Sequence, residues 1–192
     1  MSPPAVYLYP PECLHITIAT FTPFTSSNPT DPKSFSSDCS RIIKNCIARD
    51  DWLKGGRGGQ NIRIEIDRAQ IGSKAGILLW KNKDGMIDRI RKIVMEEHDN
   101  VMKVDPAVLE GRKPIVPGII HSTFLRFGMV PITAGDAVQQ KFAEVCNTDK
   151  IRALFGEIDV NSLRLVTEKI PYMHIPCDND HVLVTCKFET KN

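Results

Sequence analysis

The sequence predicts an α+β fold, because strand-like and helix-like segments follow one another in a mixed order along the chain. From the N-terminus the order reads strand, helix, two strands and helix, and then strand, helix and two strands. Strands are indicated by apolar, β-branched runs or by strict alternation, and helices by apolar residues three and four positions apart. The near-repetition of this order indicates one domain, residues 1–192, with two pseudo-symmetric lobes.

The first half of the chain begins with a strand expected over Leu14–Ile18, directly after two prolines that would interrupt sheet pairing. A helix follows over Pro32–Arg49, where apolar residues recur at helical spacing. Apolar and charged residues then alternate over Ile62–Asp67, which is typical of a strand with one dry and one wet face. Its expected partner, Ile77–Trp80, follows a turn near Gly72.

Asp84 is placed to cap the next helix, whose apolar stripe runs from Met86 to Val94. The charged stretch Val101–Pro117, which contains Gly and Pro, is expected to be a linker or crossover.

A strand over Ile119–Phe127 then mirrors the first one, and a helix is expected to begin between Thr133 and Asp136. Two late strands, Leu163–Ile170 and His181–Phe188, complete the predicted fold.

The amino-acid composition of the chain excludes some classes of function. A net charge of +2 excludes strong, sequence-independent binding of duplex DNA as the main activity, but it leaves room for a local phosphate pocket. The longest apolar runs are too short to cross a membrane. The six cysteines form no C-x-x-C pair and are expected to be reduced thiols, which favours the cytoplasm or nucleus. We expect a monomer.

Two short motifs carry the functional signal, His15-Ile16-Thr17 and His121-Ser122-Thr123. The segments around them align without gaps over nine residues, so that His, Thr and a final Phe coincide. Because side chains alternate along a strand, the His and Thr of each motif are expected to face the same way.

Such a set suits the cleavage of phosphoester bonds. One neutral imidazole can remove a proton from the attacking oxygen, while a protonated one delivers a proton to the leaving oxygen. The hydroxyls of Thr17 and Thr123 can donate hydrogen bonds to phosphoryl oxygens, which gain negative charge during attack. This arrangement requires no metal and no cofactor.

With the apolar residue that follows each motif, His15-Ile16-Thr17-Ile18 and His121-Ser122-Thr123-Phe124, the chain resembles the two-histidine (2H) phosphoesterases. The resemblance implies a bilobal α+β fold, with two small antiparallel sheets flanking a central cleft, helices on the outside and one motif per lobe. It also implies metal-independent action on 2′,3′-cyclic phosphates or 2′-5′ and 3′-5′ phosphodiesters of a nucleotide or RNA end. His15 and His121 would be the acid–base pair, with Thr17 and Thr123 holding the phosphate.

Other features have simpler explanations. His174, Cys177, His181 and Cys186 have a spacing that is atypical for zinc. Arg126 is expected to face away from His121 by strand alternation, and is left out of the site. His98, among acidic neighbours, is expected to be exposed. The glycine-rich loop around Arg57 lacks the P-loop pattern, although it could cover a cleft.

Two other functions stay open at this stage. The same residues could hold a nucleotide or RNA end without turnover, as a non-catalytic binding module. The motifs could also be fortuitous in a structural protein, which would show neither binding nor turnover.

Overall fold

The structure is a computed structural model. It describes residues 6–23, 26–52, 62–72, 74–127, 136–167 and 181–188. Across these residues the chain forms four α-helices, a five-stranded sheet and a two-stranded sheet, which confirms the α+β class. None of the helices in this part of the chain is long and apolar enough to span a membrane. The residues group into two compact units, each built from separate stretches of chain: Met1–Thr17, Arg63–Lys83 and Ile119–Asp159 in the first, and Ile18–Ile62, Asp84–Gly118 and Val160–Asn192 in the second.

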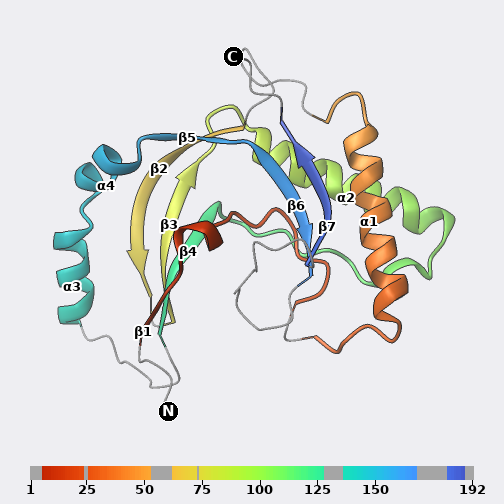
Figure 1. The fold of residues 1–192 in the computed structure, drawn as a ribbon, viewed down its shortest axis with the longest axis horizontal. Coiled ribbons are helices and arrows are strands. Elements are labelled where there is room, and N and C mark those ends of the chain that lie inside the picture. The colour runs from red at the N-terminus through yellow and green to blue at the C-terminus, as the bar shows by residue number, and fades with distance from the viewer. Residues whose placement is uncertain are drawn as a thin grey trace. The chain divides into compact units, whose positions relative to one another are not determined.

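The first unit carries the five-stranded sheet (Figure 1). Its strands lie in the spatial order β1 (Val6–Leu8), β4 (His121–Phe127), β3 (Ala75–Lys81), β2 (Ile62–Ile71) and β5 (Glu157–Val160). The β1/β4, β4/β3 and β3/β2 pairs are all antiparallel. The predicted strands Ile62–Asp67, Ile77–Trp80 and Ile119–Phe127 are therefore confirmed, and β2 is longer than expected.

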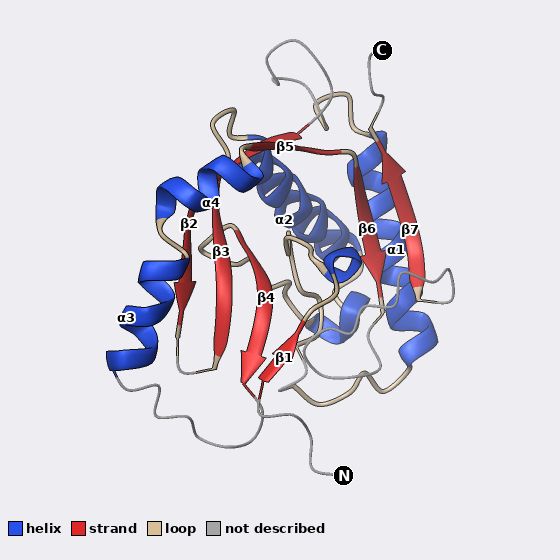
Figure 2. Cartoon of the chain, turned by 60° about the vertical axis from the view of Figure 1, so that its left-hand side comes forward, coloured by secondary structure: helices blue, strands red, loops and turns tan. Residues whose placement is uncertain are grey.

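One face of this sheet is packed and apolar. Ile64 and Ile66 of β2 and Trp80 of β3 are buried, as the alternation predicts. The helices α3 (Asp136–Val145) and α4 (Thr148–Phe155) also belong to the first unit (Figures 1 and 2). The Phe155 ring lies edge-on to Trp80, with centroids 6.4 Å apart.

The N-terminal strand differs from the prediction. Strand β1 precedes the two prolines, and Pro11–Cys13 forms a 3-10 turn instead of leading into a strand. Residues 14–17 have no regular secondary structure. The prediction of a strand over Leu14–Ile18 is wrong, because the fixed φ of consecutive prolines favours the first turn of a helix.

The second unit combines α1 (Pro32–Ala48), α2 (Met86–Val104) and a short 3-10 segment, Val108–Gly111, with the antiparallel strands β6 (Ser162–Val166) and β7 (Val182–Lys187). Strands β6 and β7 pack against α1 (Figure 2). The predicted helical stripe of α1 is buried at Phe35, Cys39, Ile42 and Cys46. Its N-terminus is capped by Asp31, whose carboxylate accepts from two backbone N–H groups.

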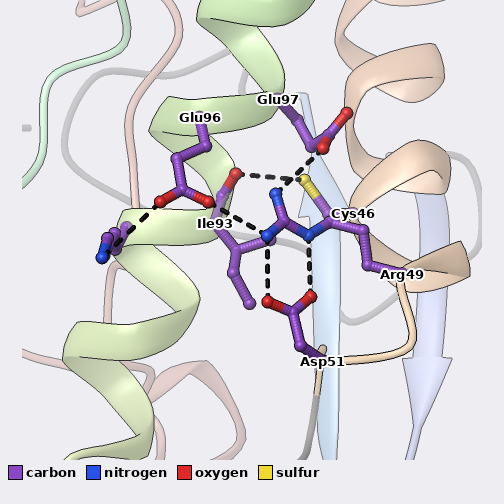
Figure 3. A network of polar contacts seen from close by, with 7 residues as sticks. Cys46, Arg49, Asp51, Ile93, Glu96 and Glu97 are labelled. Carbon is purple, nitrogen blue, oxygen red and sulfur yellow. Dashed lines mark hydrogen bonds and ion pairs between the residues drawn. The ribbon is translucent and has the colours of Figure 1, made fainter.

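Arg49 joins the C-terminal end of α1 to α2 (Figure 3). Its guanidinium donates to both carboxylate oxygens of Asp51, at 2.8 and 2.9 Å, and to Glu97 at 3.0 Å. A further ion pair with Glu96 measures 3.0 Å. Because one planar group serves three carboxylates, this network fixes how the two helices of the second unit meet.

Several boundaries differ from the sequence prediction. Helix α2 continues to Val104, so that the segment predicted as a linker from Val101 begins later. The N-cap of α2 is Gly85 rather than the predicted Asp84, although the carboxylate of Asp84 accepts from the backbone N–H of Met86 at 3.0 Å. Helix α4 and strand β5 were not predicted. Ile151, Leu154 and Phe155 do have helical spacing and Glu157–Val160 does alternate, but the two patterns extend over only eight and four residues.

Candidate functional site

His121 and Thr123 project from one face of the five-stranded sheet. His121 pairs with Leu79 and Thr123 with Ile77, and residues directly opposite each other in a ladder share a face. We call this face, which carries the odd-numbered residues of β3, the motif face. The prediction that His121 and Thr123 point the same way is confirmed by this register.

Ser122, between them, points to the packed face. It is 5% exposed, and its hydroxyl accepts a hydrogen bond of 3.0 Å from the indole N–H of Trp80. The buried pair therefore anchors the motif strand to β3 from behind and leaves its neighbours to the motif face.

Arg126 also lies on the motif face, which corrects the sequence prediction. The register of β3 and β4 shifts at Gly76, where Gly76 pairs with Leu125 but Ile77 pairs with Thr123. The extra residue in β4 reverses the alternation, so Arg126 pairs with Ala75, on the same side as Ile77. On the other side of β4, Arg126 pairs with Tyr7 of β1. The sequence signal for this bulge is Gly76, an isolated glycine directly before the predicted strand Ile77–Trp80.

His15 lies just after the Pro11–Cys13 turn, half-buried and outside any strand. Its Nδ1 is 2.8 Å from the backbone carbonyl oxygen of Cys13. A carbonyl oxygen can only accept, so Nδ1 carries the proton and the neutral ring keeps its lone pair on Nε2. The turn thus fixes both the position and the tautomer of this imidazole.

Burial lowers the pKa of His15 below its ordinary value of 6.5, and the hydrogen bond to Cys13 only partly opposes this effect. The neutral form of His15 is therefore favoured near neutral pH. A neutral imidazole with a defined lone pair has the chemistry of a general base.

All four motif residues belong to the first compact unit. The expectation was one motif per lobe, and the division into units differs from it. Two boundaries between the units do lie beside the motifs, one directly after Thr17 and one directly before Ile119. No regular strand fixes the direction of Thr17, so the expectation that His15 and Thr17 face one way stays a prediction.

The segments that hold the two motifs are hydrogen-bonded on either side of them. Within the first unit, the backbone N–H of Tyr9 donates to the carbonyl of Phe124 at 3.0 Å. Within the second, Thr20 and Ile115 form an isolated antiparallel bridge of two hydrogen bonds, 2.9 and 2.8 Å long. His15 lies between Tyr9 and Thr20, and His121 between Ile115 and Phe124. That the two imidazoles converge stays a prediction, which the contact between Tyr9 and Phe124 within the first unit favours.

His98 is buried rather than exposed, which corrects the sequence prediction. It is 3% exposed, with Nδ1 2.9 Å from the carboxylate of Asp99 and Nε2 3.0 Å from the carbonyl of Arg112. Both partners are acceptors, so this histidine holds α2 to the following segment of the second unit, and it has no part in the candidate site.

The remaining candidates are less informative. His174, Cys177 and the glycine-rich loop around Arg57 lie outside the described residues. Among the residues that the structure does describe, no group of three or more His, Cys, Asp or Glu side chains could hold a metal ion.

Burial raises the pKa of Cys39 and Cys46 to about 12, which makes these two thiols inert, as expected of packed cysteines.

Comparison with known proteins adds no relative. No protein-family model matches the chain, and neither a curated protein nor a solved structure matches it.

Proposed function

We propose that the chain is a metal-independent phosphoesterase of the two-histidine type, acting on a 2′,3′-cyclic phosphate or a phosphodiester of a nucleotide or RNA end. The observation that carries the proposal is the grouping of His121, Thr123 and Arg126 on one sheet face. An imidazole, a hydroxyl and a guanidinium together suit a phosphate, because they offer a proton, a neutral donor and a fixed positive charge.

In the proposed reaction His15 is the general base. Its Nε2 takes a proton from a water molecule, whose oxygen forms a bond to phosphorus. The bond from phosphorus to the leaving ribose oxygen breaks, and His121 in its protonated form supplies the proton which that oxygen needs. The tautomer set by the Cys13 carbonyl supports this assignment of roles.

The hydroxyls of Thr17 and Thr123 and the guanidinium of Arg126 bind the non-bridging phosphoryl oxygens in this proposal. Negative charge grows on these oxygens as water attacks, so donors held in place beforehand stabilise the transition state more than the substrate. Arg126 adds to the predicted set a permanent charge and the option of a bidentate contact.

The test is a substrate panel of nucleoside 2′,3′-cyclic phosphates and 2′-5′ linked dinucleotides, assayed with and without EDTA. We compare the wild type with His15→Ala and His121→Ala, and use His181→Ala as a matched control outside the motifs. Product formation that persists in EDTA and falls about 10²–10⁴-fold in either motif variant supports the proposal.

Binding without product would instead indicate a non-catalytic module that uses the same residues. Activity that is lost in EDTA and restored by zinc would contradict the metal-free mechanism. Full activity in either motif variant would remove that histidine from catalysis.

A further inference from the structure

A second β-bulge, in β2, turns Arg68 onto the motif face. Ile66 pairs with Trp80, but the next pair in the ladder is Arg68 with Leu79, so Asp67 is the extra residue. Strict alternation would put Arg68 on the packed side, together with Ile66, which is 0% exposed. The bulges in β2 and β4 thus have the same effect, since each brings an arginine to the face of His121 and Thr123.

Arg68 lies in line with His121 across the sheet. Both residues pair with Leu79, Arg68 from the β2 side and His121 from the β4 side. Their Cα atoms are therefore separated by two strand spacings, about 10 Å. Along the neighbouring line, Gln70 and Thr123 both pair with Ile77. Arg68 and Gln70 of β2 thus lie on the same face as His121 and Thr123, two strands away from them.

Asp67 holds Arg68 and Lys81 together. Its two carboxylate oxygens contact one cation each, with Oδ2 2.7 Å from Arg68 and Oδ1 2.7 Å from Lys81. Lys81 pairs with Glu65 in the register and, two residues after Leu79, also belongs to the motif face. Glu65 forms an ion pair with a different cation, Lys83. The three residues Asp67, Arg68 and Lys81 therefore carry one surplus positive charge.

The two cations are open to solvent. The side chain of Arg68 is 56% exposed and that of Lys81 is 54% exposed. Arg68 forms one ion pair, with Asp67, and a guanidinium has five N–H groups that can donate hydrogen bonds. An anion that arrives at this end of the motif face would meet available donors without first having to break the Asp67 contacts.

We propose that Arg68 and Lys81 form a second anion-binding position, which holds a phosphate of the substrate other than the one undergoing cleavage. The proposal rests on the proposed function, and it narrows the substrate class. A mononucleotide has no second phosphodiester to offer, whereas an oligonucleotide end does. The substrate is therefore an RNA oligonucleotide terminus rather than a free mononucleotide.

The test compares kcat/KM for a ribonucleoside 2′,3′-cyclic phosphate with kcat/KM for an RNA trinucleotide that ends in a 2′,3′-cyclic phosphate. Wild type, R68Q, K81Q and the double variant are measured at low and moderate salt. R41Q is the matched control, because Arg41 is also exposed and also pairs with a single aspartate, Asp38, at 3.1 Å.

We expect the wild type to prefer the trinucleotide, and this preference to fall about tenfold in the double variant, equivalent to about 1.4 kcal/mol. The preference should also weaken as salt rises, because it depends on phosphate contacts. R41Q should keep the wild-type preference. Equal losses on both substrates, or no loss on either, would overturn the inference.

A failure of the proposed catalytic function can be distinguished from a failure of the second anion-binding position. If the wild type converts neither substrate, the same comparison is made by binding, with a 3′-phosphorylated trinucleotide and a nucleoside 3′-monophosphate as probes. Tighter trinucleotide binding that R68Q and K81Q reduce would support the second position alone. Equal binding of both probes would overturn it.

Discussion

Arg126 and Thr123 share one face of the five-stranded sheet although they are three positions apart, a spacing that would place them on opposite faces of a regular strand. The bulge between them accounts for this relationship, and it brings a guanidinium to the face that also carries His121.

We expect Arg126→Gln to lower kcat/KM on a cyclic phosphate about 10–100-fold, since hydrogen bonds to a charged partner contribute about 1.5–3 kcal/mol. Arg126→Lys should recover only part of the loss, because an ammonium cannot bind in a bidentate manner. Arg164→Gln, on the exposed side of β6, is the control. Wild-type kinetics in Arg126→Gln would exclude this residue from phosphate binding.

Gly76 makes the bulge in β4 possible. A Cβ atom at this position would lie 2.8 Å from Cζ of Phe124, whose ring stacks on Phe142 with centroids 6.0 Å apart. Gly76→Ala should therefore lower the free energy of unfolding by about 1–3 kcal/mol, as overpacking does.

Denaturant titration measures the effect of Gly76→Ala, with Gly118→Ala as the control, because a Cβ there would meet nothing within 4 Å. If both glycine variants are equally stable, the close approach of Gly76 and Phe124 is not a constraint on the sheet.

Ser122 and Trp80 offer a separate test of how the motif strand is anchored. Ser122→Ala removes the acceptor of a buried indole N–H, which should cost about 1–3 kcal/mol of stability. Ser40→Ala is the control, since the Ser40 hydroxyl only donates to a carbonyl within α1. Unfolding curves that coincide with the wild type would mean that the Trp80 contact is dispensable.

The role of His15 predicts the direction of the pH dependence. The base must be neutral, and burial lowers the pKa of His15, so the acid limb of kcat/KM should lie below pH 6.5. The folded chain also binds fewer protons at His15 than the unfolded chain does. Its contribution to stability is therefore present above the ordinary histidine pKa and is lost as pH falls through and below 6.5.

A pH–rate profile and a ring-proton titration of His15 by NMR measure both effects. An acid limb that does not follow the His15 titration would contradict the role of base, and a His15 titration above pH 6.5 would contradict the effect of burial.

The sequence predicted the elements whose pattern is regular over many residues. The stripe of α1 and the alternation of β2 are examples, since burial of one side imposes them on the sequence. Elements set by pairing with distant segments were missed. Strand β1 has only three residues and is defined by its register with β4, and β5 has only four.

The site was predictable to the same degree. His121 and Thr123 follow from alternation, whereas the placement of Arg68 and Arg126 depends on bulges that only the register with β3 defines. His98 was misjudged from its acidic neighbours, because its second partner, the Arg112 carbonyl, is fourteen positions away.

The central claim is that His15 and His121 act on one phosphorus centre, and a double-mutant cycle tests it most directly. We measure kcat for the wild type, His15→Ala, His121→Ala and the double variant on one cyclic phosphate substrate. Groups that act as a unit lose little more together than singly, so the double variant should be about as slow as the slower single variant. A double variant whose loss equals the product of the two single losses would mean that the two imidazoles work independently, and would contradict the account.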